Sequence, residues 1–243
     1  MSIFRDGLYI RLINEFEIAN GSSEYYLLGA ALIIFAVVAS YLLGSLSSAI
    51  IVSKTLYKED IRKYGSGNAG LTNILRTYGK GAALLTLIGD MLKAAVSILI
   101  AASLFGFSYN NCISLSGVCY LAGTAAVLGH VFPIFYGFKG GKGVLVTATM
   151  ALVLTPVIFL ALILVFILVV TVSGFVSLGS IIVAALFPVT VCLYAYFLGG
   201  SVPILTAVCS IFLGAFVIWC HRSNIDRLRK GTEKKISIGK KKG

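Results

Sequence analysis

Three long stretches of the chain carry no charged side chain, and this feature limits the possible folds more than any other. No Asp, Glu, Lys or Arg occurs at residues 25–53, 94–138 or 143–221. A helix needs about 20 apolar residues to cross the ~30 Å hydrocarbon core of a bilayer. Each stretch is long enough for at least one crossing, so we predict an all-α integral membrane protein.

The composition agrees with this prediction. The chain is 58% hydrophobic and 12% charged, whereas a soluble domain has about 45–50% and about 25%. Its net charge of +11 is typical of proteins that contact membrane surfaces or phosphorylated ligands. Soluble globular, collagenous, disordered and disulfide-framework classes are excluded. The five cysteines show no C-x-x-C spacing, so we predict no metal site and no redox motif.

The distribution of charge predicts the orientation of the chain in the membrane. Residues 1–24 hold more acidic than basic side chains, whereas residues 54–80 and those after His221 are strongly basic. The positive-inside rule places both basic segments in the cytoplasm and the N-terminus outside. The polar residues 108–111 are expected to form the outer turn between the second and third crossings.

The third uncharged stretch begins and ends on the basic side, so it must contain an even number of crossings. Breakers at Pro156, at residues 173–180 and at residues 199–203 favour four short crossings over two. The fold is therefore expected to have about seven transmembrane helices, with the N-terminus extracytoplasmic and the C-terminus cytoplasmic. The helix after Gly143 would be short, and Pro156 could instead kink one longer helix.

These boundaries divide the chain into three parts. Residues 1–24 are predicted to be a polar extracytoplasmic leader, either an arm or a surface helix. Residues 25–234 form a single transmembrane domain, and residues 235–243 form a basic cytoplasmic tail.

Three segments on the basic side combine glycine with polar side chains. The first is GSGNAGLTN, residues 65–73, followed by Arg76. Alternating glycines allow a concave nest of N–H groups that fits a phosphate, and the neutral polar side chains add donors. The segment matches neither nucleotide-binding fingerprint, so nucleotide binding is not indicated. The alternative is an ordinary turn between helices.

The second and third segments flank the last uncharged stretch. In FKGGKG, residues 138–143, Lys139 and Lys142 would lie beside the N-terminus of the next helix, whose free N–H groups also attract anions. These lysines could instead be topology signals that contact lipid headgroups. In HRSNIDRLRKGTE, residues 221–233, His221 and Asn224 share one helix face. The alternative is a basic tail that only binds anionic lipid, but such a tail has no need of His221 and Asn224.

The strings GSGNAGLTN, GHVFPIFYGFKGGKG (residues 129–143) and HRSNIDRLRKGTE closely resemble, in order, the three cytoplasmic motifs of the bacterial acyl-phosphate:glycerol-3-phosphate acyltransferases (the PlsY family). The resemblance spans about residues 41–234. It implies a multi-pass enzyme of the bacterial inner (plasma) membrane whose active site lies on the cytoplasmic side. Such an enzyme transfers an acyl chain from acyl phosphate to the sn-1 hydroxyl of glycerol 3-phosphate. The products are lysophosphatidic acid and phosphate, in the first acylation step of phospholipid synthesis.

The resemblance also implies partners and site residues. The partners are acyl phosphate, glycerol 3-phosphate and membrane lipids, with no cofactor and no nucleic acid. By motif position, the donor phosphate is assigned to residues 65–73, and the acceptor to Arg76, Lys142, Arg222 and Asn224 with Ser177 and Ser180 nearby. The implied catalytic residues are His221, Asn224 and Lys142. The implied substrate-binding residues are Ser66, Gly67, Asn68, Gly70, Thr72, Asn73, Arg76, Lys139, Gly141, Ser177, Ser180 and Arg222.

Two routes stay open for the proton of the acceptor hydroxyl. His221 could act as a general base, because the only other histidine, His130, lies near the end of a predicted span. Alternatively, an oxygen of the donor phosphate accepts the proton while His221 positions the acceptor. We favour the second route.

Asp90 and Lys93 lie three residues apart within the second predicted crossing. Charged groups inside a membrane are often functional, but we interpret these two as a structural ion pair that faces the bundle.

A transporter for phosphorylated solutes and a lipid-binding module are the competing function classes. A transporter would place its polar groups near the bilayer midplane, whereas the polar motifs here are expected at one face.

Overall fold

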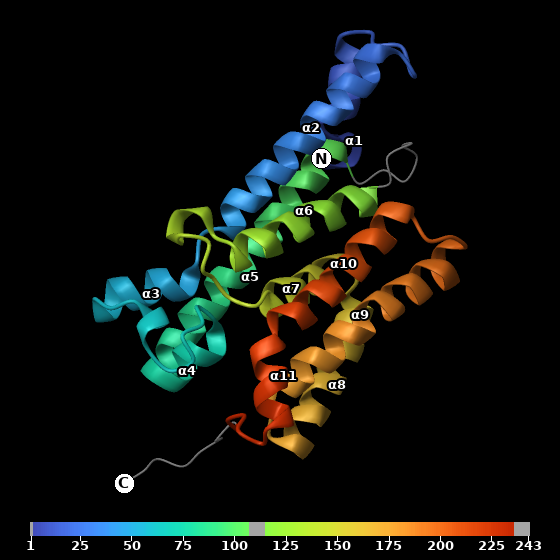
Figure 1. The fold of residues 1–243 in the computed structure, drawn as a ribbon. Helices are drawn as coiled ribbons and strands as arrows, with labels where there is room; N and C mark the ends of the chain where they lie inside the picture. Colours follow the sequence, from blue (N-terminus) through green and yellow to red (C-terminus); the bar gives the residue numbers. More distant parts are fainter. Residues whose placement is uncertain (1, 107–114, 236–243) are drawn as a thin grey trace.

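The computed structural model describes residues 2–106 and 115–235, and within them every regular element is a helix (Figure 1). This confirms the all-α prediction. The α-helices are α1 (Ser2–Glu15), α2 (Ser23–Gly44), α3 (Ser48–Tyr57), α4 (Leu71–Tyr78), α5 (Lys80–Phe105), α6 (Leu115–Val131), α7 (Val144–Leu154), α8 (Pro156–Ser173), α9 (Val176–Gly199), α10 (Ile204–Cys220) and α11 (Arg222–Arg229). Two short 3₁₀ turns, η1 (Ile61–Lys63) and η2 (Ile134–Tyr136), complete the described elements. The predicted outer turn at residues 108–111 lies outside the described residues.

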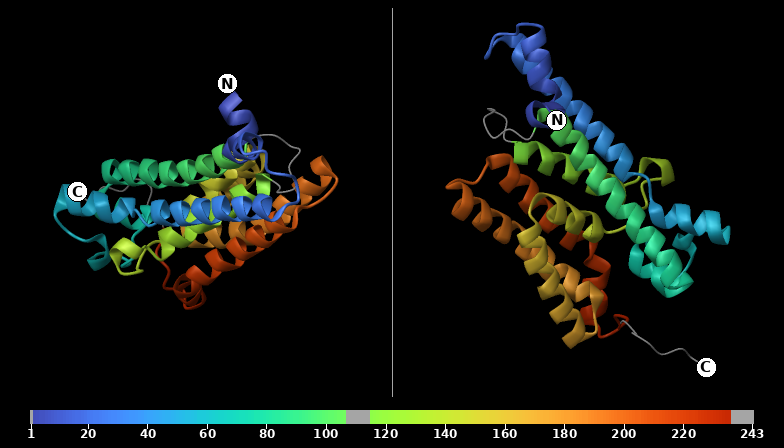
Figure 2. Two further views of the ribbon diagram at one scale, coloured as in Figure 1. Left: turned by 90° about the horizontal axis from the view of Figure 1, so that it is seen from above. Right: turned by 180° about the vertical axis from the view of Figure 1, so that it is seen from behind.

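The long helices form two groups, which are seen side by side in Figure 2. Helices α2, α5 and α6 pack on one another, and α8, α9 and α10 form the second group. Helix α7 lies between the groups and contacts α5, α6 and α8, while α10 packs on α6. The space between the groups is therefore bordered by helices from both halves of the chain.

Small residues bring α2 and α6 into close contact. A Cβ atom at Gly44 would overlap the carbonyl of Ala126, and one at Gly129 would overlap the carbonyl of Tyr41. Lipid tails are as apolar as Leu side chains, so helices in a bilayer associate mainly through close packing of this kind. These two glycines fix the position of α6, which ends beside the second polar segment.

The number of membrane crossings is not confirmed as seven. Within residues 2–106 and 115–235, five runs are long and apolar enough to cross a bilayer: Ser23–Tyr57, Lys80–Phe105, Gly117–Tyr136, Pro156–Ser173 and Val176–Gly199. Helix α10 makes a sixth when it is taken with α11, from which it is bent by 53°. Helix α7 has only 11 residues, or roughly 16 Å at 1.5 Å per residue. The structure thus separates α7 from α8 at Pro156, which begins α8, but α7 spans only about half of a bilayer.

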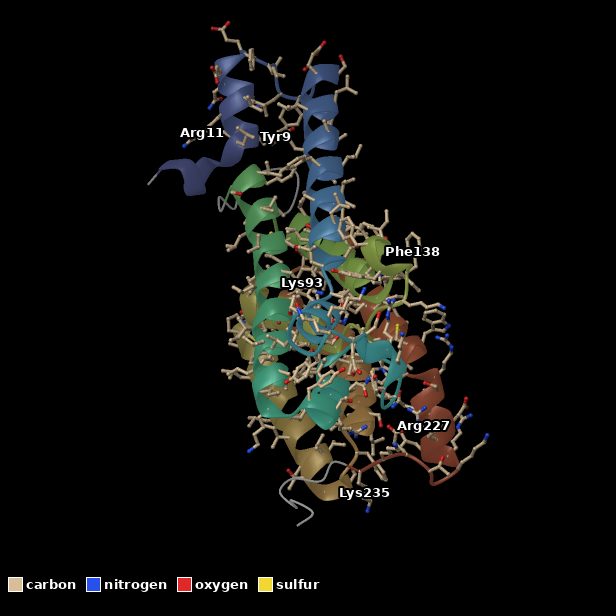
Figure 3. The ribbon with its side chains drawn as sticks, turned by 90° about the vertical axis from the view of Figure 1, so that its left-hand side faces the viewer. Tyr9, Arg11, Lys93, Phe138, Arg227 and Lys235 are labelled. Atoms are coloured by element: carbon tan, nitrogen blue, oxygen red, sulfur yellow. The ribbon has the colours of Figure 1, made fainter. Side chains whose placement is uncertain are left out.

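Residues 2–15 of the predicted leader form helix α1. This helix is kinked at Gly7, whose φ of 65° brings it against the backbone of Phe105 and Gly106. Tyr9 is buried, and its hydroxyl donates to the Tyr25 carbonyl at 3.0 Å. In Figure 3, Tyr9 and Arg11 lie at the opposite end of the molecule from Arg227 and Lys235.

Candidate active site

All three polar segments meet at one cavity of about 820 Å³ between the two helix groups. Most of the predicted site residues line it, and they come from the loop before α4 and α4 itself, the loop before α7, the start of α9, the α10–α11 bend and α11. The predicted site residues that line the cavity are Ser66, Asn68, Gly70, Thr72, Asn73, Arg76, Lys142, Ser177, Ser180, His221 and Asn224. Gly67, Lys139, Gly141 and Arg222 do not line it.

Asn73 organises the first polar loop. Its side-chain nitrogen donates to the carbonyls of Tyr64 and Asn68, each at 3.0 Å, and its side-chain oxygen accepts the N–H of Ser66 at 3.0 Å. The residue is buried at 3% exposure. Since its amide hydrogens point at loop carbonyls, Asn73 holds the loop in shape, and its side-chain nitrogen is not free for the predicted contact with the donor phosphate.

Three N–H groups of the predicted nest have acceptors inside the protein. The N–H of Gly67 donates to the Tyr64 carbonyl, that of Ala69 to Gly140, and that of Gly70 to Asn68. Like the N–H of Ser66, these three groups are not available to a phosphate, and for the other N–H groups of the loop the nest stays a prediction. The side chains of Ser66, Asn68 and Thr72 remain at the cavity wall.

The second polar loop is tied both to the first loop and to α6. Arg62 donates to the carbonyls of Tyr136 at 2.6 Å and Lys139 at 3.2 Å, and an ion pair with Asp60 at 2.7 Å fixes its guanidinium. The N–H of Gly141 donates to the His130 carbonyl at 3.1 Å. A Cβ atom at Gly141 would overlap the His130 ring. Gly141 therefore acts by permitting close packing, and this packing brings the next residue, Lys142, to the cavity.

Lys142 donates to the side-chain oxygen of Asn224 on α11. Burial lowers its pKa to about 8; the charge of Arg227 lowers it further, and that of Glu233 opposes the shift. A pKa near 8 leaves the ammonium mostly charged at neutral pH. Lys142 therefore supplies a partly desolvated cation, which attracts an anion more strongly than an exposed lysine does.

His221 occupies the bend between α10 and α11. Its Nδ1 lies 2.7 Å from the Val217 carbonyl. A carbonyl can only accept, so Nδ1 carries the hydrogen. Burial lowers the pKa of His221 to about 4, and the charge of Lys142 contributes to this shift. At neutral pH the ring is uncharged, and its Nε2 presents a lone pair.

Glu233 is a central site residue that the sequence analysis missed. Its Oε1 accepts from Asn224 at 2.7 Å and from Ser177 at 2.8 Å, and its Oε2 accepts from Arg227 at 2.6 Å. Although burial raises its pKa, these three hydrogen bonds together lower it, so the carboxylate is ionised. Glu233 thus joins α9 to α11 and fixes the amide of Asn224.

The segment after α11 crosses the mouth of the cavity. Thr232, Glu233 and Lys234 line the cavity, and Arg76 on α4 donates to the Lys234 carbonyl at 3.2 Å. The Lys235 ammonium lies 5.5 Å from the centre of the Phe175 ring. The segment thereby links the first polar loop to the α8–α9 turn.

Two cations that were predicted to bind substrate lie elsewhere. The guanidinium of Arg222 lies over the Trp219 ring, 4.4 Å from its centre, and Arg222 does not line the cavity. Lys139 is exposed, and its carbonyl accepts from Arg62. Arg227, which the prediction omitted, lines the cavity in their place.

Asp90 and Lys93 form the predicted ion pair at 2.9 Å, with both side chains buried. The Lys93 ammonium also donates to the Leu46 carbonyl at 3.0 Å and to Nδ1 of His130 at 3.0 Å. Leu46 lies in the break between α2 and α3, where helix carbonyls lose their usual partners. The pair therefore stabilises a helix break, although Asp90 and His130 also line the cavity.

The rest of the cavity is apolar. Its walls are side chains of α7, α8, α9 and α10, among them Leu145, Ala148, Phe159, Phe166, Phe187 and Leu213. Within the described residues, no group of three or more His, Cys, Asp or Glu side chains is placed to hold a metal ion. The arrangement suits a ligand with an anionic head and an apolar tail.

Comparison with known proteins agrees with this geometry. The family model for glycerol-3-phosphate acyltransferase matches residues 34–231. The chain is 45% identical to the glycerol-3-phosphate acyltransferase of Clostridioides difficile over 213 residues, which cover 86% of this chain and 97% of that protein. It is 42% identical to the enzyme of Syntrophomonas wolfei over 197 residues, which cover 81% of this chain and 93% of that protein.

Solved structures give the same result. The crystal structure of PlsY, an integral membrane glycerol 3-phosphate acyltransferase, in its glycerol 3-phosphate form matches with a TM-score of 0.72 at 35% identity. The match covers 84% of this chain and 96% of that one. The lysophosphatidic acid form matches with a TM-score of 0.70 at 34% identity. This chain is a multi-pass integral membrane protein that belongs to the glycerol-3-phosphate acyltransferase family.

Proposed function

We propose that this protein transfers an acyl chain from acyl phosphate to the sn-1 hydroxyl of glycerol 3-phosphate, releasing lysophosphatidic acid and phosphate. The reaction is the first acylation step of phospholipid synthesis. One observation carries the proposal: a single cavity joins a cationic mouth to an apolar interior. Acyl phosphate has this division of chemistry, and glycerol 3-phosphate needs only the cationic part.

The polar mouth offers groups for two phosphates. Ser66, Asn68 and Thr72 line the side nearest α4, and we assign the donor phosphate to them. Lys142, Arg76 and Arg227 supply the positive charge, and we assign the acceptor phosphate to Lys142 with Asn224. Cations that are partly withdrawn from water bind phosphate through charge-assisted hydrogen bonds.

In the proposed reaction the sn-1 oxygen attacks the acyl carbon, so a new ester C–O bond forms and the bond from that carbon to the phosphate oxygen breaks. Acyl phosphate is a mixed anhydride with a good leaving group, so alignment of the two reactants supplies much of the rate acceleration. Donors at the cavity wall stabilise the negative charge that develops on the carbonyl oxygen.

The proton of the attacking hydroxyl passes to an oxygen of the departing phosphate. His221 has a pKa of about 4, which makes it a weak base at neutral pH. The structure favours a positioning role, in which the free Nε2 accepts a hydrogen bond from the acceptor. This supports the substrate-assisted route over the general base.

The proposed orientation follows from the order of the helices. The polar segments before α4 and before α7 and the α10–α11 bend line one cavity, so they lie at one end of the bundle. Helices α7 and α8 form a hairpin. The start of α7 and the end of α8 both lie at this end of the bundle, because Gly143, just before α7, and Ser177, just after α8, line the cavity. Whether or not α7 crosses the bilayer, the N-terminus lies on the opposite side from the site. We place the site on the cytoplasmic side of a bacterial inner membrane and the leader on the opposite side, since the end of the bundle that holds the site carries the excess of Lys and Arg.

The test is release of lysophosphatidic acid and phosphate by the purified protein supplied with acyl phosphate and glycerol 3-phosphate. Glycerol in place of glycerol 3-phosphate is the matched control, because it keeps the hydroxyl and lacks the anion. Equal rates with both acceptors, or no transfer from acyl phosphate, would refute the proposal. Uptake of glycerol 3-phosphate into proteoliposomes without acyl phosphate would instead support the transporter.

A further inference from the structure

The apolar part of the cavity ends at a definite depth along α9. The lining residues of this helix recur every three or four positions along one face: Val176 and Ser177, then Ser180, then Val183 and Ala184, then Phe187. The next residue on that face, Val191, is buried at 2% exposure and does not line the cavity. The cavity therefore stops at the level of Phe187.

Helix α8 packs against α9 in the antiparallel direction and ends the cavity at a similar depth. Its lining residues run from Phe166 through Ile163 and Leu162 to Phe159, which lies in the first turn of the helix after Pro156. On α7 the last lining residue is Ala151, close to the end of that short helix at Leu154. Each helix thus reaches its last cavity residue near the α7–α8 turn.

The end of the cavity is closely packed. Phe187 and Ala151 are each 2% exposed, and Leu213 on α10 is fully buried. A Cβ atom placed on Gly214 would lie 2.7 Å from the Ala184 carbonyl oxygen and 3.0 Å from the Pro188 ring, so there is no free space beside this glycine. Protein interiors leave few voids larger than a water molecule, so a chain cannot pass this level unless a side chain moves.

The depth corresponds to an ordinary fatty acyl chain. Ser177, which bonds to Glu233 at the mouth, and Phe187 are ten residues apart on one helix, or about 15 Å along its axis. An extended alkyl chain advances about 1.25 Å per carbon, given bonds of ~1.5 Å at ~111°. The apolar part therefore holds about 12 carbons below the level of Ser177.

We propose that Phe187 and Phe159 determine the acyl-chain length that the enzyme prefers. The proposal rests on the proposed function, in which the acyl chain of the donor occupies the apolar part of the cavity. The acyl chain enters from an apolar bilayer or micelle, so each methylene that gains close contact with the cavity wall raises kcat/KM only by the dispersion energy of better packing. The gain stops when the end of the chain reaches the two phenyl rings, and longer chains are then disfavoured by steric overlap.

The test measures kcat/KM for acyl phosphates with even chain lengths from about 10 to 18 carbons. The wild-type protein should show an optimum with a decrease on the long side. Phe187→Ala should shift the optimum to longer chains by about two to four carbons, the number that spans a phenyl ring. Ala184→Leu, one turn nearer the mouth, should shift it to shorter chains.

Val191→Ala is the matched control, since it removes buried apolar volume from the same face of α9 one turn beyond the cavity. Its optimum should equal that of the wild type. A wild-type profile without an optimum, or the same optimum in Phe187→Ala and Ala184→Leu as in the wild type, would overturn the proposal. If Phe187→Ala fails to fold, Ala184→Leu decides alone. Failure of the proposed function is a separate result, namely no transfer by the wild type from acyl phosphate of any length.

Discussion

The pKa of Lys142 predicts a specific alkaline limb in the pH profile. Burial lowers this pKa to about 8, so the ammonium is charged below pH 8 and neutral above it. The kinetic constant kcat/KM reports the ionisation of the free enzyme. The phosphate monoester of glycerol 3-phosphate has a second pKa of ~6 and is mostly a dianion above about pH 7. If Lys142 binds this phosphate, kcat/KM for glycerol 3-phosphate should be level from about pH 7 to pH 8 and fall above pH 8. At pH 9 about one lysine in ten is charged, which gives a decrease of roughly tenfold.

Two substitutions separate the charge from the rest of the side chain. Lys142→Arg keeps a positive charge to above pH 12, so the limb near pH 8 should disappear. Lys142→Met should lower kcat/KM about 10- to 150-fold at pH 7, the equivalent of a charged hydrogen bond worth ~1.5–3 kcal/mol, and should also remove the limb. Lys139→Met is the matched control, because Lys139 does not line the cavity; its profile should equal that of the wild type.

The assay is the initial rate of lysophosphatidic acid formation between pH 6 and pH 10 at saturating acyl phosphate. Spontaneous hydrolysis of the donor is measured at each pH without enzyme. An alkaline limb that persists in Lys142→Arg would assign the limb to another group and refute the reasoning. A flat wild-type profile up to pH 10 would have the same effect, because no lysine with a pKa near 8 would then bind the substrate.

Three further predictions follow from the same contacts. His221→Gln should raise KM for glycerol 3-phosphate and keep kcat within about 100-fold of the wild type, because a ring with a pKa of about 4 is a weak base; a decrease of kcat by 1000-fold or more at unchanged KM would make His221 the general base. Lys93→Met leaves Asp90 buried without its ion-pair partner and should cost about 3–5 kcal/mol of stability, measured as a lower midpoint of thermal inactivation in detergent. Asp90→Asn combined with Lys93→Met should recover most of that loss, and additive effects of the two changes would refute the coupling. In a variant that lacks the native cysteines, an impermeant thiol reagent applied to intact cells should label Ser23→Cys and spare Lys230→Cys; the reverse pattern would invert the proposed orientation.

The sequence was sufficient to predict the features that depend on local composition. Uncharged stretches predicted the helices, because a bilayer permits no unpaired backbone polar groups and few charges. The spacing of Asp90 and Lys93 predicted their ion pair, because residues three apart lie on one helix face. The three polar segments were expected at one face, and the structure places them around one cavity.

The sequence was not sufficient where a contact depends on a bend or on a distant segment. Arg222 and Arg227 are both close to His221, but the 53° bend between α10 and α11 leaves Arg222 over Trp219 and Arg227 at the cavity. Glu233 acquires its role only when the segment after α11 returns to Ser177. The N–H groups of the first loop were predicted to be free, but several of them have acceptors, and the acceptor of Ala69 is Gly140, which is far away in sequence.

The short helix α7 explains how one cavity can serve two kinds of chemistry. Its first residues, Val144 and Leu145, line the cavity next to Lys142, so the positive end of its dipole faces the mouth that we assign to the phosphate groups. Its last turn includes Ala151, which lines the apolar end of the cavity. A helix of full membrane length would carry the chain past this level, whereas 11 residues return it through Pro156 after roughly 16 Å. Under the proposed function, the length of α7 therefore matches the distance between the phosphate groups and the end of the acyl chain, and a change in that length should alter both substrate alignment and chain-length preference.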